Sequence, residues 1–166
     1  MCISSQEGAL LNEYFCTTIP TVMNLPKYSV VASDPFIYHF YSEGPQGRIK
    51  KAVIYAPIED DIFNIAFGDW DEKGRRINDS NRTNNRDRDK VLATVAFTAL
   101  DFTNRFANIS IFAEGSTAAR TRLYQIGITN NLLEINRYFE IEGFSNGEWE
   151  LFRRGKNYEA FLIERK

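Results

Sequence analysis

Residues 91–100, VLATVAFTAL, are apolar almost all the way round a helix. A helix without a polar face must be buried on most of its sides. In a chain of 166 residues, 43% of them hydrophobic and 14% aromatic, one core of ordinary domain size can bury such a helix. Asp87 and Asp89 precede the segment and offer oxygens and charge that favour a helix start. The sequence therefore predicts one domain around a buried helix at residues 89–106.

The segments before this helix are typical of antiparallel strands. Residues 36–41 and 48–55 are rich in strand-forming side chains and flank the turn GPQG at 44–47, which predicts a β-hairpin. A third strand is expected at 62–67. The polar stretch 72–88 has Ile77 as its single large apolar residue and predicts a long loop. That loop is either an ordinary solvated loop or a mobile lid.

The segments after the buried helix continue the alternation of strands and helices. A short strand is expected at 108–113, and a second helix is expected from Ser116 or Thr117 to residue 126, with a further helical turn at 130–139. Strands follow at 138–144, 148–152 and 158–163. The order βββ-α-β-α-β-β predicts an α+β fold, with a mixed, largely antiparallel sheet of about six or seven strands packed on the two helices.

Residues 1–22 do not continue this pattern and are interpreted as a dispensable N-terminal leader. Met23 would then be the natural start, and residues 23–166 the single domain. A short docking helix at 7–16 is the alternative. Both cysteines, Cys2 and Cys16, lie in the leader, so the body has no thiol for a disulfide, a zinc site or a nucleophile.

Several functional classes find no support in the composition. There is no run of about 18 apolar residues and no signal peptide, so we expect a cytoplasmic protein without a membrane segment. The only histidine, His39, lies in a strand, so a Ser-His-Asp relay or histidine metal site is not expected. We expect no cofactor and no metal, although magnesium at Asp69 and Asp71 stays open. The sequence does not decide whether the protein is an enzyme, and a function without catalysis is favoured.

Basic residues beside aromatic residues leave nucleic acid open as a partner. They are Arg48, Lys50 and Lys51 with Tyr55, and Arg153, Arg154 and Lys156 with Tyr158. Such side chains can bind backbone phosphates and stack on bases. The same spacing also fits ordinary strand edges that are protected by charge.

The strand-to-helix junction at 115–124, GSTAARTRLY, is the candidate site. A helix start presents unpaired N–H groups, Ser116 and Thr117 add hydroxyls, and Arg120 and Arg122 add guanidinium groups that suit phosphate. Because Arg122 lies about 200° around the helix from Arg120, one of the two is expected to be structural. Arg86 and Arg88 from the preceding loop are expected to close on the same anion. The alternative is a capped amphipathic helix whose arginines form ion pairs.

Six segments together resemble an uncharacterised bacterial family, a domain of unknown function with a G-S-T-x-A-R-T-R-L-Y motif. The resemblance runs from about residue 23 to residue 166 and implies no established activity, cofactor or site residue. The segments that carry it are NLPKY at 24–28, SEGPQGRIKK at 42–51, FGDWD at 67–71, NNRDRDKVLATV at 84–95, GSTAARTRLY at 115–124 and NYEAFL at 157–162.

A weaker likeness concerns the fold. The succession strand, loop, helix, strand, helix ending in LYQIGI at 123–128, then hairpin, is similar to the C-terminal half of the GCN5-related acetyltransferases. That resemblance implies a general-acid role for Tyr124. Their pyrophosphate loop is rich in glycine, whereas residues 84–89, NNRDRD, contain none, which argues against a close approach of the backbone to a pyrophosphate.

The sequence alone leaves three functions open. The first is a small intracellular module that binds a phosphate-bearing or other anionic ligand at the 115–124 junction. The second is a protein-interaction component, such as an antitoxin or defence accessory. The third is a degenerate acyltransferase-like enzyme. Neither the ligand, nor a protein partner, nor the oligomeric state follows from the sequence.

Overall fold

The computed structural model of the chain describes residues 25–78 and 84–166. The predicted leader, the proposed start at Met23 and part of the polar loop lie outside the described residues. The elements are, in chain order, β1 Val31–Asp34, β2 Ile37–Gly44, β3 Gly47–Pro57, β4 Ile62–Asp71, β5 Arg76–Asn78, α1 Arg88–Arg105, β6 Ser110–Ala113, α2 Ala118–Ile135, β7 Phe139–Ser145, β8 Glu148–Leu151 and β9 Ala160–Arg165.

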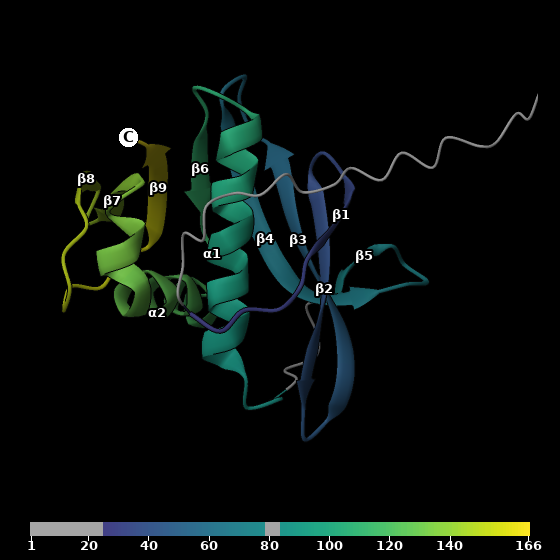
Figure 1. The fold of residues 1–166 in the computed structure, drawn as a ribbon. Coiled ribbons are helices and arrows are strands. Elements are labelled where there is room, and N and C mark those ends of the chain that lie inside the picture. Colours follow the sequence, from purple (N-terminus) through teal and green to yellow (C-terminus); the bar gives the residue numbers. More distant parts are fainter. Residues whose placement is uncertain (1–24, 79–83) are drawn as a thin grey trace, which may run out of the picture.

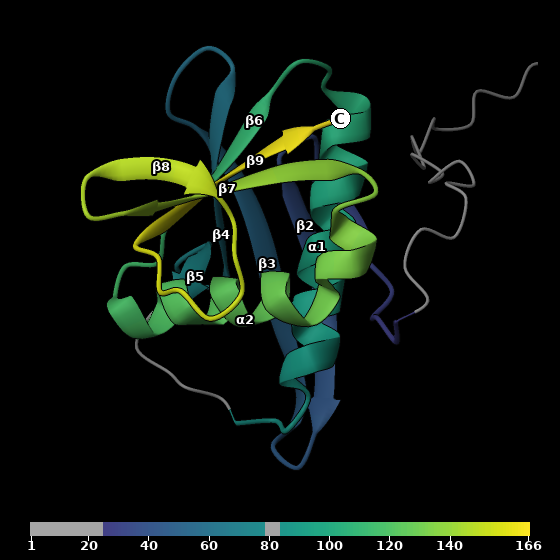
Figure 2. The same cartoon turned by 90° about the vertical axis from the view of Figure 1, so that its left-hand side faces the viewer.

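The described strands form one sheet in the order β1-β2-β3-β4-β6-β9-β7-β8, with β5 paired to β4. β4 and β6 are parallel, and every other neighbouring pair is antiparallel. Figures 1 and 2 show α1 running along the sheet and α2 lying across the direction of α1. The predicted α+β class and element order are confirmed, and the described residues form nine strands where six or seven were expected.

Two departures from the expected elements have simple physical causes. The strand β5 lies inside the predicted polar loop, where Ile77 pairs with Trp70 of β4. The helix α2 does not end at residue 126 but continues to Ile135. Gly127 lies against the side chain of Leu92, so this glycine marks a close contact between the two helices and not a helix end.

The helix α1 is buried as predicted, and its polar groups are satisfied within the core. The Tyr55 ring stacks on Phe102 with centroids 4.0 Å apart, and its hydroxyl lies 2.9 Å from Thr98 Oγ1. Thr94 and Thr98 donate their hydroxyl protons to carbonyls of their own helix. Hydroxyls that bond back to the helix can be buried without an unpaired donor. Among the described residues, no helix is long and apolar enough to cross a membrane.

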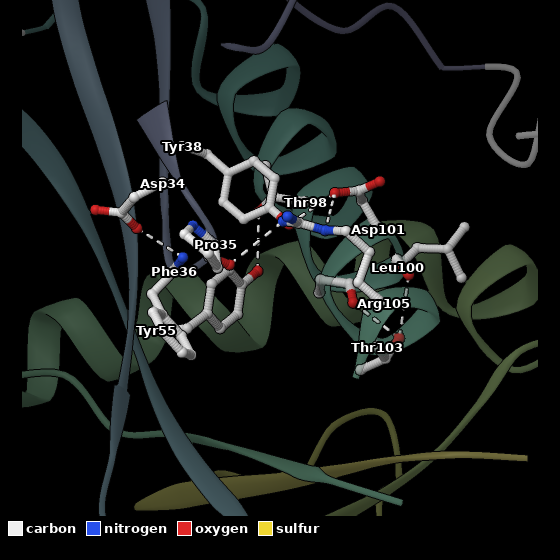
Figure 3. A network of polar contacts seen from close by, with 11 residues as sticks. Asp34, Pro35, Phe36, Tyr38, Tyr55, Thr98, Leu100, Asp101, Thr103 and Arg105 are labelled. Atoms are coloured by element: carbon white, nitrogen blue, oxygen red, sulfur yellow. Dashed lines mark hydrogen bonds and ion pairs between the residues drawn. The ribbon is translucent and has the colours of Figure 1, made fainter. Parts of the chain in front are cut away.

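A polar cluster fixes the last turns of α1 to β2 (Figure 3). The Tyr38 hydroxyl donates to Asp101 Oδ2 at 2.7 Å, and Arg105 contacts both the Tyr38 hydroxyl and, at 3.1 Å, Asp101. Burial raises the pKa of Tyr38 far above its usual value of 10.0, with the Asp101 carboxylate acting in the same direction. Tyr38 therefore stays protonated and serves as a permanent hydrogen-bond donor to the helix.

A second polar cluster, which we call the clasp, fixes the start of α1 to the β2–β3 hairpin. The buried Asn85 donates to Ser42 Oγ at 2.9 Å and to the Gly47 carbonyl at 3.0 Å, and its Oδ1 accepts from Gln46 N at 2.9 Å. Asp87, the N-cap residue of α1, makes no capping bond with its side chain. Its carboxylate instead accepts from Ser42 at 2.5 Å and from Tyr28 at 2.8 Å.

The clasp requires glycine at position 44. A Cβ built on Gly44 would lie 2.0 Å from the Asn85 carbonyl oxygen, so any side chain there would displace the Asn85 backbone. The contact joins residues about forty apart in the sequence and sets where α1 begins. It also explains why the first turn of α1 lies at the hairpin.

We predict that Asn85→Ala lowers the free energy of unfolding by about 2–4 kcal/mol, because it removes three hydrogen bonds and the buried side chain that makes them. The matched control is Asn84→Ala at the exposed neighbour, which should change stability by less than about 0.5 kcal/mol. Urea denaturation of the two variants measures the difference. Equal losses of stability would show that the clasp does not hold the helix.

His39 lies on the other face of the sheet, where its ring meets Trp70 edge to face at 4.8 Å. Its Nδ1 is buried without a hydrogen-bond partner in the described structure. Burial lowers the pKa of His39 below its usual 6.5, and the positive charge of Lys50 acts in the same direction. The folded protein therefore favours the neutral ring.

Because the folded state binds this proton less tightly than the unfolded chain does, the stability contributed by His39 is present at neutral pH. It is lost as the pH falls from about 7 through the usual value of 6.5 and then through the lowered pKa of the folded state. We expect a steeper loss of stability over that range in the wild type than in His39→Gln. An NMR titration of the ring should give a pKa below 6.5. A value above 6.5, with parallel stability curves, would contradict the assignment.

Candidate ligand-binding cleft

The parallel strands β4 and β6 are paired only over three residue pairs, from Ile62 with Ser110 to Asn64 with Phe112. The Ser110 amide donates to the Asp61 carbonyl at 2.8 Å at the start of this pairing. Along a strand, alternate residues point their backbone groups to the same neighbour, so the next carbonyls of β4 that face β6 belong to Phe63 and Ile65. Beyond Asn64 the pairing stops, and β6 itself ends one residue later, at Ala113.

Tyr124 of α2 supplies the hydrogen bond that β4 would otherwise receive from a neighbouring strand at Ile65. Its hydroxyl donates to the Ile65 carbonyl at 2.9 Å, at the first position of β4 that β6 no longer reaches. Its ring meets Phe67 edge to face at 5.3 Å. A buried carbonyl without a partner would cost free energy, so the tyrosine compensates for the end of the pairing.

A cleft of about 1020 Å³ lies beyond the end of this pairing. One wall is the second half of β4 with its neighbours in β3 and β5, and the other is the junction of β6 with the first turns of α2. The cleft is lined by Lys51, Asn64, Ala66, Phe67, Gly68, Asp69, Ile77, Asn78, Glu114, Gly115, Ser116, Thr117, Ala119, Arg120, Leu123 and Tyr124.

The first turn of α2 is built by short-range hydrogen bonds. Thr117 is the N-cap residue, with its side-chain oxygen accepting from the Arg120 amide at 3.3 Å. The Gly115 amide donates to Thr121 Oγ1 at 3.0 Å, and a Cβ on Gly115 would lie 2.3 Å from the Thr121 amide nitrogen. The glycine therefore lets the chain fold back on the helix. The amides of Ala118 and Ala119, in the first turn, have no acceptor within α2.

The described lining residues carry two positive and two negative charges. Lys51 and Asp69 are opposite each other on β3 and β4 and form an ion pair with side chains only 10% and 14% exposed. Arg120 and Glu114 lie on the other wall, near the helix start. Among the described lining residues, Arg120 and Glu114 are therefore the charges at the helix start, together with the helix dipole.

The structure brings together some of the candidate residues and separates others. Ser116, Thr117 and Arg120 line the cleft. Arg122 is exposed outside it and donates to Asn157 Oδ1 at 2.7 Å. Its position matches a structural role for one of the two arginines.

The predicted meeting of the two helix starts does not occur. Arg86 and Arg88 are exposed at the start of α1, and no residue of the segment 84–90 lines the cleft. The physical reason is the clasp, in which Asn85 and Asp87 fix this segment to the β2–β3 hairpin. Figure 2 shows the start of α1 beside that hairpin. Neither arginine is therefore retained as part of the candidate site.

The remaining charged candidates make contacts within the protein. Asp69 pairs with Lys51, and Asp71 accepts from the Lys73 amide at 3.0 Å. Most of the basic residues considered for nucleic acid contact acids, and Arg154 contacts a carbonyl. These contacts are Arg48 with Glu43, Lys50 with Glu72, Arg153 and Lys156 with Glu150, and Arg154 with the carbonyl of Thr129.

Lys51, Asp69 and Asn78 were not predicted to belong to the 115–124 site. Lys51 was considered only for nucleic acid and Asp69 only for magnesium. The sequence shows Lys51 in a basic run and Asp69 in an acidic turn, and both patterns are common at surfaces. For Lys51 the signal that the sequence offers is the alternation of side chains between the two faces of a strand. Lys51 has the same parity as Val53 and Tyr55, so it must point to the face of the sheet that those core residues occupy.

Five of the six segments that carry the family resemblance contribute to the clasp or to the cleft. Three of them contribute to the clasp, through Tyr28, Ser42 and Asn85. Two others, at 67–71 and 115–124, line the cleft. Comparison with known proteins finds no match among curated proteins and none among solved structures. A family model matches residues 24–166, and the chain therefore belongs to DUF6934, a family of unknown function.

Proposed function

We propose that the protein binds a phosphate-bearing small molecule in the cleft, with the anionic group at the start of α2. The observation that carries the proposal is the cleft itself, about 1020 Å³ in volume, with the first turn of a helix in its wall. This is the upper end of the size range of small-molecule sites. Its location outside the carboxyl ends of neighbouring parallel strands is a common place for ligands.

The chemistry of the helix start supports an anion. The Ala118 and Ala119 amides and the positive end of the helix dipole favour negative charge, and the hydroxyl of Ser116 is exposed beside them. Arg120 adds a guanidinium group from the same wall. Glu114 acts in the opposite direction, because its carboxylate repels an anion.

We expect Arg120→Ala to weaken the binding of ribose 5-phosphate by about 1.5–3 kcal/mol, the scale of a hydrogen bond to a charged group. The matched control is Arg122→Ala, which lies on the same helix outside the cleft and should leave the affinity unchanged. Glu114→Gln should strengthen binding because it removes a repulsive charge. Isothermal titration calorimetry on the four proteins measures these effects, with denaturation curves to compare their stability.

The opposite pattern identifies the alternative interpretation. If Arg120→Ala lowers stability and leaves the affinity unchanged, the arginine is a structural ion-pair partner. If Arg120→Ala and Arg122→Ala weaken binding equally, the anion does not bind in the cleft.

Acyl transfer is a second candidate, favoured by the strand order. The succession of β4, α1, β6, α2 and the β7–β8 hairpin is the element order on which the resemblance to acetyltransferases rests. Against it, residues 84–89 contain no glycine, and the Tyr124 hydroxyl donates to Ile65. A hydroxyl that is engaged with the backbone is a poor choice for general acid.

Tyr124→Phe separates the structural role of the tyrosine from a catalytic one. We expect the variant to lose about 1–3 kcal/mol of stability, because the Ile65 carbonyl is left unpaired. The affinity for ribose 5-phosphate should be unchanged. Acetyl-CoA turnover that the wild type shows and the variant lacks would favour acyl transfer instead.

A protein-interaction function is supported by the edge strand β8. Trp149 and Leu151 alternate along this strand and are 43% and 58% exposed. Apolar side chains on an unpaired strand edge are a feature of surfaces that add a partner strand. Size-exclusion chromatography of Trp149→Ser beside the wild type tests whether this edge holds a partner chain.

A further inference from the structure

The ion pair of Lys51 and Asp69 occupies positions on the sheet that the core would otherwise fill. Lys51 continues the row of Val53 and Tyr55 on β3, and Asp69 continues the row of Ile65 and Phe67 on β4. All of these alternate residues point to the face that the helices cover. Asn78 of β5 is the next neighbour of Asp69 across the sheet and also lines the cleft.

Stability alone is a weak reason to place an ion pair there. Removing two charges from water costs free energy that their attraction often fails to recover, and two apolar side chains of similar size would serve the fold as well. The neighbouring pair of Lys50 with Glu72 shows the contrast, since it lies on the outer face with Glu72 largely exposed. Lys51 and Asp69, in contrast, both line the cleft.

We propose, on the basis of the function proposed above, that the cleft takes a nucleoside phosphate whose base edge is recognised by Lys51 and Asp69. An ammonium group only donates hydrogen bonds and a carboxylate only accepts them. Side by side, they complement a base edge with an acceptor next to donors. Guanine fits best, because its O6 accepts from Lys51 while its N1–H and its 2-amino group donate to Asp69.

The rest of the cleft suits the remainder of such a ligand. The base-recognition pair lies on the sheet wall and the proposed phosphate position lies on the helix wall. Apolar side chains of Phe67, Leu123 and Tyr124 line the cleft with them. Two of these are aromatic, and aromatic side chains stack on bases. A volume of about 1020 Å³ accommodates a mononucleotide.

The test compares ligands that differ only in the base. Calorimetry is performed on the full chain with ribose 5-phosphate, guanosine 5′-monophosphate, xanthosine 5′-monophosphate and adenosine 5′-monophosphate. We expect the guanosine nucleotide to bind about tenfold more tightly than ribose 5-phosphate, the scale of one bidentate base contact. The xanthosine nucleotide should lose this gain, because an oxygen replaces the 2-amino group and faces the Asp69 carboxylate.

Two variants test the base-recognition pair and one serves as control. Lys51→Met/Asp69→Asn removes the charges, and Lys51→Asp/Asp69→Lys exchanges them while keeping an ion pair within the fold. Both should lose the guanosine preference and retain the affinity for ribose 5-phosphate. The control Lys50→Met/Glu72→Gln removes an ion pair one residue away and should retain the preference. If the uncharged variant does not fold, the exchanged variant still gives the answer.

The outcomes distinguish this inference from the function on which it rests. If ribose 5-phosphate binds and the guanosine nucleotide binds no better, the base-recognition role is overturned and phosphate binding stands. A preference for the adenosine nucleotide overturns the assignment of guanine. If none of the four ligands binds, the proposed function fails and this inference fails with it.

Discussion

Three residue pairs hold β4 to β6, and the shortness of this pairing shapes the rest of the molecule. If the strands had continued side by side, the sheet would be closed where the cleft now lies. Because the pairing stops at Asn64, the Ile65 carbonyl needs another donor, which Tyr124 supplies from α2. The early end of the pairing also exposes the first turn of α2 to the cleft and leaves Lys51 and Asp69 facing it. The fold and the candidate site therefore have one physical origin.

The long, strongly patterned elements could be predicted from the sequence, and the short ones could not. The helix expected at 89–106 is found as Arg88–Arg105, because its apolar run has no alternative to burial. The strand β1 has no buried residue and so no alternation to detect. The length of α2 was underestimated because Gly127 looks like a helix end in the sequence. Only the contact with Leu92 shows why the helix continues.

The candidate site was predictable from its helix wall and not from its sheet wall. Ser116, Thr117 and Arg120 follow one another in the chain, so a single local motif contains them. Lys51 and Asp69 are 18 residues apart and meet only through the register of β3 with β4. Arg86 was misplaced for a related reason, since the hydrogen bonds of Asn85 to the hairpin join distant segments. Strand register and long-range side-chain hydrogen bonds are the features that could not be predicted from one sequence.

The position of β9 determines when the sheet can be completed. This strand, Ala160–Arg165, follows all the others in the chain and pairs with β6 on one side and β7 on the other. Until it has been made, the hairpin of β7 and β8 has no link through the sheet to the strands that precede it. During synthesis the strands β1–β6 and the β7–β8 hairpin therefore stay unjoined within the sheet, and each has an unpaired strand edge. These two edges can pair wrongly until β9 inserts between β6 and β7.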